Sequence, residues 1–331
     1  MKLMADVIVA QPGLLQGGSD TLAGYLKIFA GETITAFARA SVTEGRHMER
    51  TIEHGKSAQF PVFGRAKAAY LKPGKSLDDI RENIPGNERV IHIDGLLTTS
   101  QLITDIDDAM SHVDVRGEYA RQMGEALAIA KDAAVLAEAA KLVVEDTENI
   151  TGLGKGKVIT KTVASEDIGI TEAYGKAIVS MLLEAKAALS KNKVPQTDRY
   201  CFITPEGHAS LVASLVAINR DFGAVATITE GNVLRVAGFD VIECPHLTEG
   251  GVDAANVLQG AGHIFPAAHK NDTVCVIMHR TAVGTVKLKD LALEQARRAE
   301  YQADMLVAKY AMGHDGLRPE AAFLGKVVAA V

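Results

Sequence analysis

The spacing of apolar residues along the chain predicts where its helices lie. Over residues 101–144, apolar positions recur every three or four residues, which is the repeat of one face of an α-helix. We expect a short helix first, with its apolar face formed by Leu102, Ile106, Met110 and Val113. One long helix should follow, from 116 to 144. Further helices are predicted over residues 21–40, 172–190 and 205–218.

Alternating apolar and polar residues predict the strands. Residues 55–97 read as a long hairpin, with Phe60 and Val62 on the outgoing side and Ile91 and Ile93 on the return. A two-stranded ribbon is marginal by itself in water, so we expect this hairpin to lie on another copy of the chain. Further strands are predicted at 200–203, 225–229, 239–244, 274–278, 283–288, 301–310 and 323–328, with a turn at 312–319.

Composition excludes several classes of protein. The chain has 331 residues, of which 47% are apolar, enough to offset the entropy lost on folding and so to exclude a disordered chain. The three cysteines, Cys201, Cys244 and Cys275, are too few and too far apart for a disulfide scaffold or a zinc module. The net charge of -6 argues against a protein that grips nucleic acid over its whole surface.

The sequence also bears on location. No window holds about eighteen uninterrupted apolar residues, so we expect no membrane-spanning segment and no membrane partner. The first residues, MKLMADVIVAQPG, lack the long apolar core of a secretory signal. We therefore expect a protein that is made and kept in a reducing cytoplasm.

Charge is segregated along the chain. Residues 56–75 hold five basic residues and no acid, whereas residues 101–150 hold eleven acids and four bases. Segregated charge of both signs favours head-to-tail association of identical copies. For Arg297 and Arg298, local ion pairs within the chain and a contact with another subunit both stay open. The predicted inter-subunit contact residues are Lys56, Arg65, Lys67, Lys72, Asp78, Asp79, Arg81, Asp114, Glu118, Arg297 and Arg298.

A search for chemistry yields no catalytic, cofactor-binding or metal-binding candidate. Gly55-Lys56-Ser57 resembles the end of a phosphate-binding loop, but Arg50 stands where that motif needs glycine. Asp105 and its neighbours lack the glycine and glutamate of a calcium loop, and His263 and His269 lie on a loop without further ligands. We expect no enzyme and no cofactor. A soluble α/β enzyme built on residues 166–278 is the alternative, and it would need a pocket with a strongly perturbed titratable group.

Several collinear segments resemble one known family, the major capsid proteins of short-tailed phages related to the T-seven group. The resemblance runs along nearly the whole chain, and its most specific parts are long. Among them are ITAFARASVT (34–43), GKSAQFPVFGR (55–65), HRTAVGTVKLKDLALE (279–294) and AKYAMGH (308–314).

This resemblance implies an α+β fold, the tailed-phage capsid fold of the Hong Kong 97 type. An N-terminal arm would occupy residues 1–52 and an E-loop hairpin residues 53–100. The P-domain would comprise 101–165, with a long spine helix, and the return strands of 279–331. The A-domain would occupy 166–278.

The resemblance also implies a structural function. Copies would self-assemble into pentamers and hexamers that form an icosahedral phage head, which encloses double-stranded DNA without sequence-specific binding. A scaffolding protein during assembly and a portal at one vertex would be further partners. The protein would reside in the virion after assembly in the host bacterial cytoplasm. An encapsulin-type compartment shell, which shares the fold, is the nearest alternative.

Overall fold

The computed structural model describes residues 40–74, 76–79, 81, 83–106, 115–214, 226–227, 232–233, 235–252, 256–258 and 262–330. Its α-helices are α3 (Val115–Val144), α4 (Glu172–Lys191) and α5 (Pro205–Ala213). One sheet contains β1 (Met48–Thr51), β4 (Leu97–Thr104), β12 (Val283–Arg298) and β13 (Ala303–Gly316). A second contains β5 (Lys157–Val163), β6 (Arg199–Ile203), β9 (Arg235–Val236), β10 (Phe239–Glu243), β11 (Thr273–His279) and β14 (Ala322–Ala329). Two strand pairs remain, β2 (Ser57–Phe63) with β3 (Gly86–His92), and β7 (Ala226–Thr227) with β8 (Asn232–Val233).

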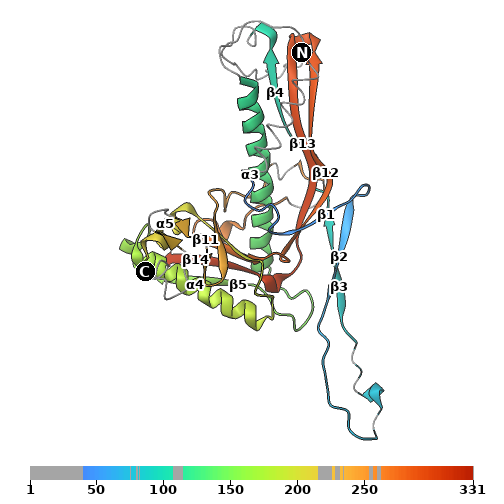
Figure 1. Ribbon diagram of the computed structural model, residues 1–331, viewed down its shortest axis with the longest axis vertical. Coiled ribbons are helices and arrows are strands. Elements are labelled where there is room, and N and C mark those ends of the chain that lie inside the picture. The colour runs from blue at the N-terminus through green and yellow to red at the C-terminus, as the bar shows by residue number, and fades with distance from the viewer. Residues whose placement is uncertain are drawn as a thin grey trace.

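Helix α3 links the two larger sheets. Its 30 residues span about 45 Å at the usual rise per residue. In its first half, Ala120, Met123 and Leu127 pack against β4 and β13. In its second half, residues 135–143 belong to the main core together with β11, β14 and α4. Figure 1 shows the helix standing beside the long strands, with the six-stranded sheet against its lower half.

The four-stranded sheet has the order β1-β12-β13-β4. Strands β12 and β13 form a long antiparallel hairpin, and β4 pairs antiparallel with β13 from Leu97 to Thr104. The predicted short helix is therefore wrong at its start, because Leu102 lies on β4 rather than on a helix. The β-branched run around it forms ladder hydrogen bonds with β13, and this tertiary pairing overrides the four-residue spacing. Residues 107–114 lie outside the described part of the chain.

The six-stranded sheet has the order β5-β14-β11-β6-β10-β9. Its central strand β11 is buried at every residue, because α3 lies on one side of the sheet and α4 packs near β14 and β5. Strands buried on both faces read as continuous apolar runs, as residues 274–278 do. Sheet membership joins β5 and β14 to the strands of the 166–278 segment, although the sequence division assigns both to the P-domain segments.

Strands β2 and β3 form the expected hairpin, with Ala58 opposite Ile91 and Phe60 opposite Arg89. The expectation that this hairpin has no partner in its own chain is wrong for its base. There Phe60, Ile91 and Ile93 pack against Val286 and Leu317 of the body. A further contact joins Val62 to Ile150 and Leu153. The base is therefore fixed to its own body, and the remainder extends away from it (Figure 1).

Most other predictions of helices and strands are confirmed. The long helix, the helix at 172–190 and the strands at 200–203, 239–244, 274–278 and 323–328 lie within two residues of their predicted ends. Strand β12 runs ten residues further than predicted, and β13 continues to Gly316 through the expected turn at 312–319. Helix α5 ends at Ala213. The predicted helix at 21–40, apart from Ala40, and most of residues 215–231 lie outside the described part of the chain.

The three cysteines lie on or directly after strands of the second sheet and are all buried and free. A hydrogen bond with Cys275, together with burial, raises the pKa of Cys201, and burial raises the pKa of Cys244 to about 12. The strand locations predicted from sequence are confirmed for Cys201 and Cys275, while Cys244 follows β10. Within the described ranges, no helix has both the length and the apolar character needed to cross a membrane.

Gly313 marks the closest approach between the hairpin base and β13. A Cβ atom at this position would lie 1.9 Å from the carbonyl oxygen of His92. Gly313→Ala should therefore lower the free energy of unfolding by about 2–3 kcal/mol, because backbone atoms on both sides would have to separate. Urea unfolding measures this change. Gly86→Ala is the matched control, since its Cβ would meet only the Phe63 ring at 3.6 Å. Equal stability of the two variants would contradict the close approach.

Candidate assembly surfaces

The hairpin exposes large apolar side chains beyond its base. We call residues 63–85 the hairpin tip. Phe63, at the end of β2, is 70% exposed, and Tyr70 is fully exposed. Leu71, Leu77 and Ile84 are exposed as well. Large apolar side chains gathered on one projecting segment are typical of an interaction surface rather than of a free monomer surface.

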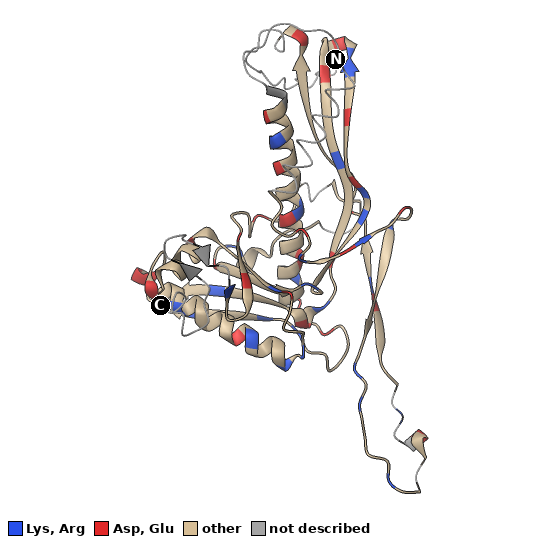
Figure 2. Ribbon diagram, viewed as in Figure 1, with Lys and Arg blue, Asp and Glu red and all other residues tan. Residues whose placement is uncertain are grey.

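The predicted basic residues of the hairpin lie along its outgoing limb (Figure 2). Lys56 precedes β2, and Lys67 and Lys72 lie on the hairpin tip, all three exposed. Arg65 differs, because its guanidinium donates a hydrogen bond to the carbonyl oxygen of Asn192, the residue that caps the end of α4. The Arg65 side chain, which was predicted to contact another subunit, thus already has one partner within its own chain.

The return limb carries a short 3-10 helix, η1 (Leu77–Asp79). Asp78 and Asp79 belong to it, and Arg81 follows. The Arg81 guanidinium lies 3.0 Å from the Asp78 carboxylate, with both side chains more than 70% exposed. Exposed ion pairs of this kind contribute little stability. The Arg81–Asp78 pair can therefore break at small cost in free energy, and both side chains can then contact another molecule.

The first half of α3 carries an exposed group of three charged side chains. Arg121 lies between Glu118 and Glu125, with its Nε 3.0 Å from Glu118 and its Nη1 2.5 Å from Glu125. The hydrogen bonds from Arg121, with a further one from Gln122, lower the pKa of Glu118 to about 2. Two carboxylates share one guanidinium, and Arg116, two residues before Glu118, makes residues 115–129 neutral overall. Asp114, the other predicted contact on this stretch, lies outside the described residues.

The acids of the second half of α3 do not belong to that exposed group. Within the acid-rich segment 101–150, Asp132 is fully buried and Glu138 is 8% exposed. The helix enters the protein core between Leu127 and Val143. Each of the two carboxylates therefore has partners from distant parts of the chain instead of water.

Arg297 and Arg298 lie at the far end of β12. The Arg297 guanidinium donates to both carboxylate oxygens of Asp105 and lies 3.4 Å from Asp304. The hydrogen bonds to Asp105 and Asp304 raise its pKa, even against the effect of burial. Local pairing, one of the two interpretations open from sequence, is therefore present for Arg297. Arg298 is exposed.

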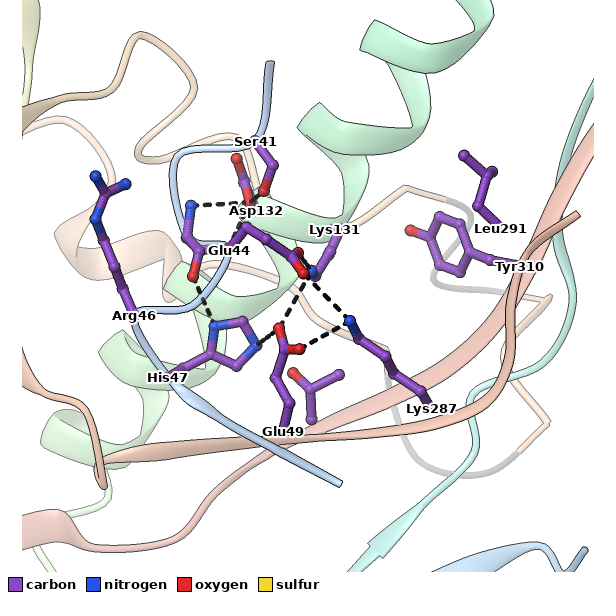
Figure 3. A network of polar contacts seen from close by, with 12 residues as sticks. Ser41, Glu44, Arg46, His47, Glu49, Lys131, Asp132, Lys287, Leu291 and Tyr310 are labelled. Carbon is purple, nitrogen blue, oxygen red and sulfur yellow. Dashed lines mark hydrogen bonds and ion pairs between the residues drawn. The ribbon is translucent and has the colours of Figure 1, made fainter. Parts of the chain in front are cut away.

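Buried Asp132 binds the segment that precedes β1. Its carboxylate accepts hydrogen bonds from the Ser41 hydroxyl at 2.8 Å, from the Val42 amide at 2.5 Å and from the amide and hydroxyl of Thr43 (Figure 3). Burial alone would raise the pKa of Asp132, but these bonds and His246 outweigh it and lower the pKa. We call this set the Asp132 anchor, since it fixes residues 41–43 to α3.

A second group of charges fixes the next residues of the same segment. Lys131 is fully buried and binds Glu44 and Glu49, and Lys287 of β12 binds the same two carboxylates, at 3.3 and 2.8 Å. Two positive and two negative charges thus balance, since Lys131 is fully buried and the partly exposed Glu44 and Glu49 side chains reach it from the surface. Figure 3 shows the four side chains converging between α3 and β12. Segment 41–51 is consequently tied to the helix and to the four-stranded sheet at once.

Sequence reasoning missed both groups of contacts. The available signal was that Lys131 and Asp132 are adjacent charges inside an otherwise alanine-rich, apolar stretch, from Ala126 to Ala137. Adjacent positions on a helix point in different directions. If such an apolar stretch of helix is buried, both of its charged side chains are buried with it. Each of them then needs a partner from another part of the chain.

Asp132→Asn tests the anchor. An amide offers one acceptor oxygen where the carboxylate accepts four bonds, so buried donors of residues 41–43 would lose their partner. We expect the free energy of unfolding to fall by about 3 kcal/mol, measured by urea denaturation. Because the folded pKa of Asp132 is lowered, its contribution is complete above the unfolded value of about 4 and is lost as the pH falls below it. Glu125→Gln, an exposed acid on the same helix, should change stability by less than about 0.5 kcal/mol. A loss no larger than that of this control would refute the anchor.

Known proteins are similar to this chain in sequence and in fold. The Gp10A-like major capsid protein family matches residues 59–326. The major capsid protein of Escherichia phage T7 is 51% identical over 322 residues, which are 94% of this chain and 93% of that protein. The major capsid protein of Enterobacteria phage T3 is 53% identical over 321 residues, 93% of this chain and 92% of that protein. The capsid structure of the cyanophage P-SCSP1u is 34% identical with a TM-score of 0.73, covering 88% of this chain and 89% of that one.

These matches confirm the family seen in the sequence and the tailed-phage capsid fold that it implied. The relatives are structural proteins of phage capsids, so the role is structural and not catalytic, and the protein is a virion component that associates with itself. With a family match over most of its length and relatives above 50% identity, this chain belongs to the Gp10A-like major capsid proteins, which form the shell of the phage head.

Proposed function

We propose that each copy of this protein lays its hairpin tip on the body of the next copy, and that such head-to-tail contacts close pentamers and hexamers of an icosahedral shell. A contact between two different surfaces of the same chain generates rings when its rotation closes. The observation that carries the proposal is the exposure of Phe63, Tyr70 and Leu71 on a segment that projects from the body.

The fixed base of the hairpin supports this arrangement. Phe60, Ile91 and Ile93 hold the base on the body, so the tip is presented in a defined direction instead of moving freely. Preorganisation lowers the entropy lost on binding. Individual contacts can then be weak, since many of them form at once in a closed shell.

Charge gives the contact a direction. We propose that Lys67 and Lys72 face acids of the neighbouring copy, such as Glu118 or Asp114. Glu118 lies on the exposed side of the first half of α3, where two carboxylates share one guanidinium. Complementary charge chiefly steers association and selects the register of the contact. The predicted contact roles of Lys56, Asp78, Asp79, Arg81 and Arg298 belong to the same proposal.

Further partners follow from membership of the family. We propose a scaffolding protein during assembly, a portal at one vertex and double-stranded DNA inside the finished head, with assembly in the host bacterial cytoplasm. We also propose the division into an arm (1–52), E-loop (53–100), P-domain (101–165 with 279–331) and A-domain (166–278). The encapsulin-type alternative is disfavoured because relatives at 51–53% identity are phage capsid proteins.

The double substitution Tyr70→Ser and Leu71→Ser tests the apolar contact. Both side chains are exposed in the single chain, so the melting temperature of the unassembled protein should stay the same, whereas shells should no longer form. Negative-stain electron microscopy and sedimentation velocity detect the shells. Ile168→Ser, at an exposed apolar position before α4, is the control and should assemble normally. Normal shells from the double variant would rule out the proposed hairpin contact.

Reversing two charges tests the direction of association. Lys67→Glu with Lys72→Glu should reduce the rate of capsomer formation at least tenfold at low salt, and the deficit should shrink as salt rises, because screening weakens exposed charges. Light scattering during assembly gives the rate. Arg65 is left unchanged, since it binds Asn192 within its own chain. Adding Glu118→Lys should restore part of the rate, and no restoration would point to a different acidic partner.

A further inference from the structure

His263 lies between two carboxylates from different parts of the fold. Its Nδ1 is 2.7 Å from the Glu138 carboxylate on α3, and its Nε2 is 2.8 Å from the Asp94 carboxylate, in the connection between β3 and β4. The side chains of His263 and Glu138 are only 12% and 10% exposed, and that of Asp94 is 23% exposed. Only an imidazolium can donate to both carboxylates, because a neutral ring has one donor nitrogen.

Backbone hydrogen bonds join the hairpin base to β13 and to the loop that carries His263. The amide of Asp94 donates to Met312 of β13 at 3.1 Å, and its carbonyl accepts from the Leu258 amide at 2.8 Å. The Gly251 amide donates to the carbonyl of His263 at 2.6 Å. The hairpin base, α3 and residues 249–252, 256–258 and 262–265, which together we call the 249–265 loop, therefore meet around His263.

The junction is held by the charges at its centre. Lys141 lies 2.6 Å from the Glu138 carboxylate and donates to the carbonyl of Gly262 at 2.6 Å. On the α3 side of the junction, Lys141 and the protonated His263 thus both contact the Glu138 carboxylate. With Asp94, the centre carries two positive and two negative charges, which balance when His263 is protonated.

A cavity and a glycine with an unusual backbone conformation lie next to these charges. A cavity of about 280 Å³ is lined by residues of the hairpin base, of α3 and of the 249–265 loop, His263 among them. Leu96 and Val252 at its edge are more than half exposed. Gly95, adjacent to Asp94, has a φ of 143°, which side-chain-bearing residues rarely adopt. The connection after Asp94 can therefore change direction without displacing the packed core.

We propose that Asp94, His263 and Glu138 form a charge clamp that holds the hairpin base, α3 and the 249–265 loop in one arrangement, and that opening of this clamp frees the hairpin base and the loop together. The structure makes this clamp a conformational switch within one subunit. A hairpin drawn to a new position by a neighbouring molecule pulls on Asp94, and through His263 on the loop.

The surroundings of His263 give the clamp a pH dependence. Burial alone would lower the pKa of His263, but its bonds to Asp94 and Glu138 outweigh burial and raise the pKa to about 9. The other titratable groups around the junction are Lys141 of α3 and, on β13, Tyr310, His314 and Asp315. The His314 ring lies 5.4 Å away, and burial lowers its pKa well below the usual value, so it is neutral and does not repel the imidazolium.

The sign of the pH effect follows from this shift. The folded pKa of His263 is higher than the unfolded value of about 6.5. The stabilisation by the clamp is therefore fully present below pH 6.5 and is lost as the pH rises through about 9. Acids that titrate in the ordinary carboxylate range play no part in that window.

Hydrogen–deuterium exchange of the full-length protein, read by mass spectrometry, tests the clamp. In His263→Gln, peptides covering 93–98 and 249–258 should exchange at least about tenfold faster, since the charge-assisted bonds that close both segments are lost. Peptides from the core strand β11 should keep their protection. His92→Gln is the matched control, because the His92 side chain is exposed on the same hairpin base and should leave both peptides unchanged.

The unsubstituted protein supplies a second measurement that needs no variant. After correction for the intrinsic exchange rate, protection of both peptides should fall together between pH 7 and 10, with β11 unaffected. If His263→Gln also exposes β11, the variant has unfolded globally and this pH series decides alone. Protection that stays constant up to pH 10, or that falls in one peptide only, would overturn the clamp.

Discussion

The burial of one half of a helix by two sheets determines most of this fold. From Ala130 to Val143, α3 is covered nearly all round, which is possible because alanine side chains let the neighbouring strands approach closely. The same burial means that Lys131 and Asp132, which lie in this half of the helix, need partners inside the protein. Burying a charge without partners costs far more than a surface pair contributes, so segment 41–51 has to lie where its amides, hydroxyls and carboxylates can serve them.

Local pattern was sufficient to predict the elements whose burial follows their own periodicity. The long helix and the apolar strand β11 belong to this group, since each has a clear repeat or an unbroken apolar run. Strand β4 was misjudged because Leu102 and Ile106 have helical spacing by coincidence, and the decision rests on β13, some 200 residues later in the chain. The residues around Leu102 alone do not indicate that they pair with β13.

The candidate surfaces show the same division. Glu118, Glu125 and Asp132 are seven residues apart and lie along nearly one side of the helix, yet two are exposed and one is fully buried. Among the described residues, those at 41–43 and His246 contact Asp132 and so separate it from the other two. Segregated charge in the sequence therefore identified an acid-rich segment, 101–150, but it could not say which of its acids meet water. The basic limb of the hairpin was easier to place, because Lys56, Lys67 and Lys72 are exposed in the described part of the chain.

The burial of the three cysteines has a practical consequence. Cys201, Cys244 and Cys275 account for every cysteine in the chain, and all are enclosed and unpaired. Attack by a thiol requires its thiolate form and access to the reagent, and neither is offered by a buried sulfur of raised pKa such as that of Cys201 or Cys244. A single cysteine introduced on the exposed hairpin would consequently be the one thiol within reach of a maleimide in the folded protein. The native sequence is thus ready for position-specific labelling of the shell, with a dye, a spin label or a displayed peptide, without removal of any natural residue.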